Sequence, residues 1–75
     1  MEKDKFVYDK RKAMGESIRA MRTAQVLEQE QLAKIAGITT SNVCSVEAGK
    51  YAVNIDVLNK IAEALNAELR IIEKE

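Results

Sequence analysis

Apolar and polar residues follow a helical period along most of the chain. The first periodic segment places its inward face at Met14, Ile18, Met21 and Gln25. This spacing predicts a helix from about Asp9, which suits the N-cap position, to about Gln25. Leu27 is then expected to join the core. Residues 1–8 show no clear period, so we predict that they form an N-terminal arm.

Three shorter helices are predicted over residues 29–36, 40–48 and 55–65. Their inward residues are Leu32, Ile35 and Ala36 in the first, Val43 and Val46 in the second, and Val57, Leu58, Ile61 and Leu65 in the third. Each set recurs at intervals of three or four residues, which is typical of one buried helix face. The fold class that follows is mainly α.

Glycines and small polar residues mark where these helices begin and end. Gly37 and Gly49 suit the left-handed position that follows a helix, while Thr39 and Asn54 suit the N-cap. Very few residues then separate the helix over 29–36 from the helix over 40–48. Two helices joined by so short a turn are typical of a helix-turn-helix.

The pattern changes after Asn66. Residues 67–73 alternate polar and apolar side chains, which predicts a β-strand, although a fifth helix is the alternative. A single strand leaves its backbone N–H and C=O groups without partners. We therefore expect this segment to pair with its copy in a second chain, through an interface formed by Leu69, Ile71 and Ile72.

The composition excludes several classes of protein. The 75 residues, 47% of them hydrophobic and 4% aromatic, indicate one small helical domain. The sequence has no histidine and one cysteine, which removes the common metal sites, Ser-His or Cys-His nucleophiles and any intramolecular disulfide. We expect no enzyme activity, no metal, no cofactor and no small-molecule ligand.

The hydropathy of the chain and the distribution of its charges indicate where the protein is located and which face could bind a partner. No apolar run approaches the roughly 18 to 20 residues of a membrane span, and no signal-peptide core is present, so we expect a cytoplasmic protein. Twelve basic and twelve acidic residues cancel, but residues 1–22 carry seven basic and four acidic side chains, a net of +3. This segment either presents a basic face or is an ordinary solvated helix surface.

Several groups of residues, in order, resemble the Xre/Cro family of phage-repressor-like DNA-binding domains. The groups are Gly15, Ile18-Arg19 and Arg22; Gln29-Glu30-Gln31-Leu32-Ala33; Gly37-Ile38-Thr39; Val43 and Val46-Glu47-Ala48-Gly49-Lys50; and Ile61-Ala62-Glu63-Ala64-Leu65. The resemblance implies a repressor-like domain of four to five helices over residues 9–66. It also implies that residues 67–75 form a dimerisation strand and tail.

The resemblance assigns roles on double-stranded DNA to particular positions. It implies base contacts from Thr40, Ser41, Cys44 and Ser45, on the outer face of the second helix of the motif. It implies backbone contacts from Arg22, Gln29, Asn42, Lys50 and Tyr51. The alternatives are an adenine contact for Asn42 and packing on the core for Tyr51. An ion pair between Arg22 and Glu47 is implied as well, acting as a clamp between helices, with or without a phosphate contact. Ala33 is implied to pack where the two motif helices cross.

The sequence departs from the family pattern at a few positions. Val26 stands where a glycine commonly ends the first helix, and a β-branched residue resists the left-handed conformation, so this helix is expected to run on or end differently. Glu28 replaces the usual Ser, Thr or Asn cap. Ala52 and Val53 supply no cation where relatives often have one.

Two functions from different classes fit these residues. The first is a homodimeric transcriptional repressor that binds specific DNA sequences. The second is an antitoxin or protein-interaction module whose main role is to hold a partner such as a toxin, because the C-terminal segment resembles a subgroup of antitoxin-like repressors. Cys44 is either a plain small side chain or a redox-sensitive thiol on the DNA-facing surface.

Overall fold

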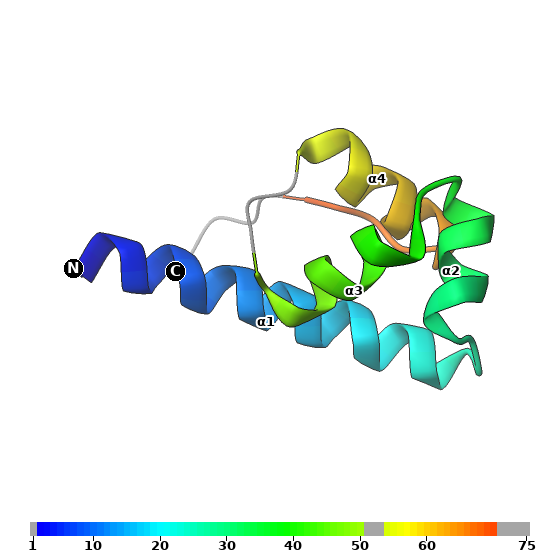
Figure 1. The fold of residues 1–75 in the computed structure, drawn as a ribbon, viewed down its shortest axis with the longest axis horizontal. Coiled ribbons are helices and arrows are strands. Elements are labelled where there is room, and N and C mark those ends of the chain that lie inside the picture. The colour runs from blue at the N-terminus through cyan, green and yellow to red at the C-terminus, as the bar shows by residue number, and fades with distance from the viewer. Residues whose placement is uncertain (1, 51–53, 71–75) are drawn as a thin grey trace.

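The computed structural model describes the backbone of residues 2–50 and 54–70, and the side chains of residues 10–50 and 54–70. Within these ranges the chain forms four helices, α1 (Glu2–Ala24), α2 (Gln29–Ala36), α3 (Thr40–Ala48) and α4 (Ile55–Ala64). Helix α1 is the longest of these helices, α3 packs along it, and α2 and α4 lie on the same side of α1 as α3 (Figure 1). None of the helices in the described part of the chain combines the length and apolar character needed to cross a membrane.

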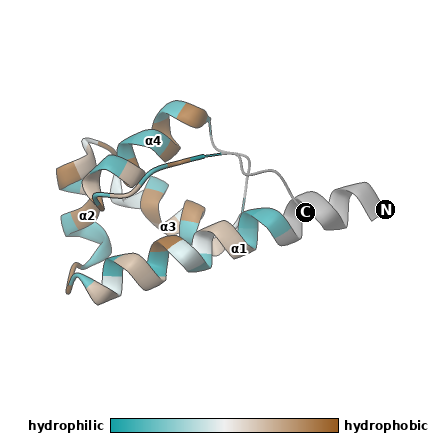
Figure 2. Ribbon diagram, turned by 180° about the vertical axis from the view of Figure 1, so that it is seen from behind, coloured by the Kyte–Doolittle hydropathy of each residue, from teal (hydrophilic) through white to brown (hydrophobic). Residues whose placement is uncertain are grey.

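The core is small and lies where the four helices meet. Its buried members are Ile18, Leu32, Ala33, Val43, Val46, Ile61 and Leu65. Leu27, Val57 and Leu58 pack against this cluster, as predicted. Figure 2 shows that hydrophobic stretches alternate with hydrophilic ones along α2, α3 and α4. The burial of apolar area in this cluster is the main force that holds the helices together.

Four residues predicted to lie on inward helix faces are exposed: Met14, Met21, Gln25 and Ile35. Met14 and Met21 are 38% and 37% accessible, and Ile35 is 59% accessible. The inward stripe of α1 is formed by Gly15, Ile18 and Arg22 instead, because that stripe faces α3. The buried face of α1 is thus rotated relative to the face that periodicity alone predicts, whereas the predicted inward residues Val43 and Val46 of α3 are buried.

Gly15 sets the distance between α1 and α3. A Cβ atom built on Gly15 would collide with the carbonyl oxygens of Val46 and Glu47 and would lie 2.7 Å from the carbonyl carbon of Glu47. The absence of a side chain therefore allows the two backbones to touch. Helix α3 lies beside α1 in both ribbon views (Figures 1 and 2).

Each of the four described helices ends in the same hydrogen-bonded turn. The residues in the left-handed conformation are Val26, Gly37, Gly49 and Asn66, with φ of 57°, 73°, 67° and 56°. After α1, for example, the Leu27 N–H donates to the Arg22 carbonyl at 3.1 Å and the Val26 N–H donates to the Thr23 carbonyl at 3.0 Å. This pair of bonds is the Schellman motif. The predicted roles of Gly37 and Gly49 are confirmed.

Val26 takes this conformation despite its β-branched side chain, so α1 ends where a glycine would have ended it. The expectation that helix 1 would run on or end differently is wrong. The Val26 side chain is 87% exposed, so little packing compensates for the strained backbone.

The predicted N-caps of α3 and α4 are confirmed. The Thr39 hydroxyl accepts from the Asn42 N–H at 3.1 Å, and the Asn54 side chain accepts from the Val57 N–H at 2.9 Å. Before α2, the Gln31 side chain accepts from the Glu28 N–H at 2.8 Å, in the manner of a capping box. Glu28 thus occupies the N-cap position in place of the usual small polar residue.

The two ends of the chain differ from the prediction. Helix α1 begins at Glu2 rather than near Asp9, so the arm predicted over residues 1–8 is mostly helical backbone. Glu and Lys have good helix propensity, so a segment that contains them can form a helix without an apolar period. At the other end, residues 67–70 lie in neither helix nor strand, and residues 71–73 of the predicted strand lie outside the described residues.

Candidate nucleic-acid interface

Helices α2 and α3 are joined by residues 37–39 and form the predicted helix-turn-helix. Leu32 and Ala33 of α2 and Val43 of α3 are at most 2% accessible, which fixes the angle between the helices by close packing. The small Ala33 lies at this contact, in agreement with its implied role. The remaining face of α3 is left for a partner.

The residues implied to contact bases are distributed over that outer face. Thr40, Ser41 and Cys44 are exposed, whereas Ser45 and Asn42 are half-buried. Three of the four implied base-contacting side chains are therefore open to solvent. Ser45 sits nearer the core, and its carbonyl accepts from the Lys50 N–H at 3.2 Å. The hydroxyl and thiol groups can donate and accept hydrogen bonds at base edges.

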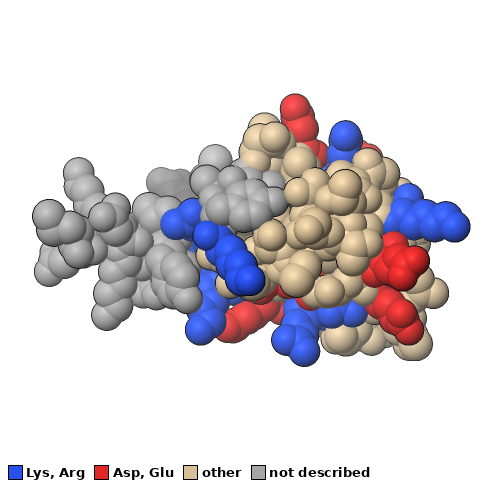
Figure 3. All heavy atoms as spheres, viewed as in Figure 1, with Lys and Arg blue, Asp and Glu red and all other residues tan. Residues whose placement is uncertain are grey.

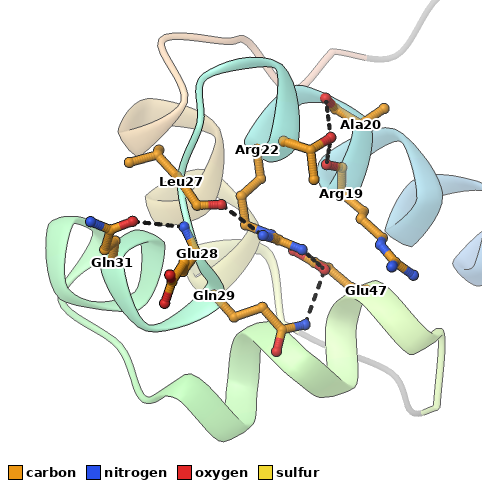
Figure 4. A network of polar contacts seen from close by, with 9 residues as sticks. Arg19, Ala20, Arg22, Leu27, Glu28, Gln29, Gln31 and Glu47 are labelled. Atoms are coloured by element: carbon orange, nitrogen blue, oxygen red, sulfur yellow. Dashed lines mark hydrogen bonds and ion pairs between the residues drawn. The ribbon is translucent and has the colours of Figure 1, made fainter.

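A buried ion pair locks α3 against α1 (Figure 4). The Arg22 Nε donates to Glu47 Oε2 at 2.7 Å and the Nη2 donates to Oε1 at 3.1 Å. The side chains are only 10% and 4% accessible. This is the bidentate geometry that a guanidinium makes with a carboxylate. The clamp between helices that the resemblance implies for Arg22 and Glu47 is therefore present in the fold.

Two further groups complete this network. The Arg22 Nη1 donates to the Leu27 carbonyl at 2.7 Å, which ties the ion pair to the turn after α1. The Gln29 side-chain nitrogen donates to Glu47 Oε1 at 3.1 Å. Gln29 thus directs one N–H of its side-chain amide inward, at the carboxylate, so at most the second N–H of this amide serves a phosphate. The sequence could not show this, because Glu47 lies eighteen residues further along the chain.

The pKa of Arg22 is raised above its usual value. The first cause is its hydrogen bond to Glu47; burial opposes the shift, and attraction to the carboxylates of Glu47 and Glu28 adds to it. For a basic group with a raised pKa, the stabilisation is complete below the ordinary pKa and is lost only as the pH rises through the raised one. Arg22 therefore stays charged, and contributes no pH dependence, at neutral pH.

A shallow polar hollow lies beside this network. It is lined by Arg19, Arg22, Glu28, Gln29, Glu30 and Thr40, and so joins the end of α1 to the first turns of α2 and α3. Arg19 was not among the predicted site residues. Arg19 lies three residues before Arg22, which places the two on neighbouring positions of the helix surface. This spacing could have identified Arg19 as a site residue from the sequence.

The other predicted residues are placed as follows. Lys50 is exposed directly after α3, at the end of the outer face. Tyr51, Ile71 and Ile72 lie outside the described residues, and Leu69 is half-buried. Cys44 is a free, exposed thiol. Within the described ranges, the acidic and cysteine side chains form no cluster able to hold a metal ion.

The chain is similar to known helix-turn-helix proteins in sequence and in fold. The helix-turn-helix family matches residues 18–72. Control protein C.SmaI of Serratia marcescens is 34% identical over 61 residues, which cover 81% of this chain and 73% of that protein. The crystal structure of the restriction-modification controller protein C.AhdI from Aeromonas hydrophila matches with a TM-score of 0.77 at 38% identity, over 81% of this chain and 88% of that one.

A more distant structure shares the fold. The crystal structure of the clp gene regulator ClgR from C. glutamicum matches with a TM-score of 0.71 over 77% of this chain and 75% of that one, at 24% identity. The resemblance to Xre/Cro-type domains is thus confirmed by family, sequence and fold. The chain belongs to the helix-turn-helix family of DNA-binding transcriptional regulators.

Proposed function

We propose that this regulator acts as a homodimeric repressor and reads a two-fold symmetric DNA site through the outer face of α3. One observation carries the proposal: α3 buries Val43, Val46 and Glu47 and leaves Thr40, Ser41 and Cys44 exposed. In a helix-turn-helix the second helix enters the major groove and contacts base edges. A helix locked on its inner side and polar on its outer side suits that role.

The proposed base contacts come from small side chains. Thr40, Ser41 and Ser45 offer hydroxyls, and the Cys44 sulfur or the Thr40 methyl group can pack against a thymine methyl. Hydroxyls accept and donate equally well, so each contact discriminates weakly between bases. Part of the specificity is therefore expected to come from DNA shape and from bridging water.

The proposed backbone contacts surround this face. Lys50 extends from the end of α3, and Tyr51 follows it in the chain, so both are assigned to phosphates. Asn42, half-buried beside the outer face, is assigned to the sugar–phosphate backbone. Arg22 and Gln29 reach DNA only with the donor groups left over after they bind Glu47. Their first role is to hold α3 in place.

An apolar groove supports the homodimer. It is lined by Met14, Ile18 and Met21 of α1, by Leu58 of α4, and by Leu65 and Leu69, which follow α4. Among the described residues, none from α2 or α3 lines this groove, so a partner bound there would leave the helix-turn-helix free. The segment predicted to pair between two copies, residues 67–73, begins at this groove. We propose that Leu69, Ile71 and Ile72 form the interface.

The relatives support the regulatory role. C.SmaI is a control protein and C.AhdI is a restriction-modification controller. We propose that this chain also controls genes of a restriction–modification system. The names of these relatives favour gene control over the antitoxin alternative, and a toxin partner stays an untested hypothesis.

A selection of bound sequences from a random duplex pool tests the proposed function. The full chain should enrich sites with two related halves, centred about 10 base pairs apart or at a multiple of that spacing, because a two-fold dimer presents two α3 helices to successive major grooves. Ser41→Ala should enrich a different sequence in each half. No enrichment over the input pool at low salt would contradict the proposal.

A further inference from the structure

We infer that the edge of α1 formed by Lys12 and Arg19, here named the α1 basic edge, lies along the DNA phosphate backbone beside the groove that receives α3. This inference rests on the proposed function and adds a DNA contact surface from a helix outside the helix-turn-helix. It depends on three features of the structure: the direction of α3 along α1, the exposure of the two cations, and the position of Glu16 between them.

Helix α3 runs antiparallel to α1. Near the end of α1, Arg19 lines the polar hollow together with Thr40, the first residue of α3. Nearer its start, the backbone of Lys12 touches the end of α3, since a Cβ atom on Gly49 would lie 2.9 Å from the Lys12 Cα. Between the two, Gly15 contacts the backbone of Val46 and Glu47. Arg19 and Lys12 therefore flank opposite ends of the α3 helix.

The two cations share one side of α1. They are seven residues apart, which places them about 10.5 Å apart along the helix axis and on nearly the same face. That face is rotated away from the side on which Ile18 enters the core. Both side chains are exposed, and within the described residues neither forms an ion pair. In the space-filling view, basic side chains interrupted by an acidic one follow the edge formed by α1 (Figure 3).

Unpaired cations along a docked helix suit phosphates. When α3 occupies the major groove, the phosphates of the flanking strand pass beside it. A rigid helix that holds two cations about 10.5 Å apart can meet different phosphates of one strand. Contacts of this kind position the protein and carry no sequence information. Lys50, which follows Gly49, extends the same line of cations past the end of α3.

Glu16 gives a prediction opposite in direction to those for the two cations. It lies four residues after Lys12 and three before Arg19, so it shares their side of α1, and it is exposed. A carboxylate at this position repels a phosphate backbone that passes along the α1 basic edge. Replacing it with a neutral side chain of the same size should therefore strengthen DNA binding.

The test measures the dissociation constant of the full chain across a salt series, on two synthetic duplexes of equal length. One carries a site recovered by the selection described above and the other an unrelated sequence. The variants are Arg19→Ala, Arg19→Lys, Lys12→Ala and Glu16→Gln. Lys60→Ala is the matched control, because Lys60 is an exposed cation on α4 and loses the same charge. Thermal unfolding of each variant verifies the fold.

Arg19→Ala and Lys12→Ala should each weaken DNA binding at low salt and make the slope of log K against log salt shallower by about 0.9. A tenfold rise in salt should therefore cost each variant roughly eightfold less affinity than it costs the parent. The loss should be equal on both duplexes. Arg19→Lys should retain the parent slope, because a phosphate accepts either cation, and Glu16→Gln should bind both duplexes more tightly than the parent.

Two results would overturn the inference and can be told apart. If the parent binds but the α1 variants all have the slope of Lys60→Ala and Glu16→Gln binds like the parent, the α1 basic edge does not contact DNA, while the proposed function stands. If the parent binds neither duplex at any salt concentration, the proposed function fails and this inference fails with it.

Discussion

Removing the carboxylate of Glu47 is the most informative perturbation of the fold. Glu47 accepts from Arg22 at 2.7 and 3.1 Å and from Gln29 at 3.1 Å, so it joins α3 to α1 and to α2. The variant Glu47→Ala leaves the guanidinium of Arg22 in a site where its side chain is only 10% accessible. The charge then has the Leu27 carbonyl as its remaining acceptor among these contacts.

The expected loss is large for so small a domain. Removing one member of a buried ion pair costs about 3 to 5 kcal/mol, because the remaining charge stays desolvated. At roughly 0.05 to 0.15 kcal/mol per residue, a domain of this length has a total stability of about 4 to 11 kcal/mol. We therefore expect Glu47→Ala to remove about a quarter or more of the free energy of unfolding.

Equilibrium unfolding in urea, followed by circular dichroism at one fixed protein concentration, measures this loss. Glu63→Ala is the matched control, because Glu63 is an exposed glutamate on α4 and its removal should change stability by at most about 0.5 kcal/mol. The double variant Arg22→Met with Glu47→Ala should be less destabilised than the sum of the two single variants, since no unpaired charge remains. If Glu47→Ala costs no more than Glu63→Ala, the clamp contributes nothing to stability and the reasoning is refuted.

Three further predictions concern packing, backbone strain and assembly. Gly15→Ala should lower the free energy of unfolding by about 1 to 3 kcal/mol despite its better helix propensity, because the new methyl group meets the backbone of α3; an unchanged urea midpoint would contradict the close contact. Val26→Gly should raise stability by roughly 0.5 to 1 kcal/mol, the relief of a left-handed valine less the added entropy of the unfolded chain; a destabilised variant would show that Val26 is not strained. Ile71→Pro should shift the sedimentation of the chain toward monomer while the thermal unfolding of the helices is retained; a variant that dimerises like the parent excludes the proposed interface.

The ends of α2 and α3 and the start of α4 could be predicted from the sequence because local chemistry sets them. Thr39 and Asn54 cap helices through their own side chains, and Gly37 and Gly49 adopt a conformation that other residues resist. Such signals act within three or four residues. They need no knowledge of the rest of the fold.

Features that depend on long-range packing could not be predicted in the same way. The period of α1 allows several neighbouring stripes to face inward, and the contact of Gly15 with α3 selects one that leaves Met14 and Met21 exposed. The inward turn of the Gln29 amide likewise depends on Glu47, which only the folded chain brings near. The extension of α1 to Glu2 could not be predicted from the apolar period, because that period identifies an amphipathic helix and does not identify every helical residue.

The central claim, that the exposed face of α3 reads DNA sequence, is tested most directly by a ratio of two dissociation constants. Fluorescence anisotropy at one salt concentration gives the affinity for the selected duplex and for an unrelated duplex of equal length. For Ser41→Ala the affinity for the selected duplex should fall by about fivefold, which corresponds to about 1 kcal/mol for one base contact, while the affinity for the unrelated duplex stays unchanged. A ratio equal to that of the parent for Ser41→Ala, and also for the alanine variants of Thr40 and Cys44, would contradict the account.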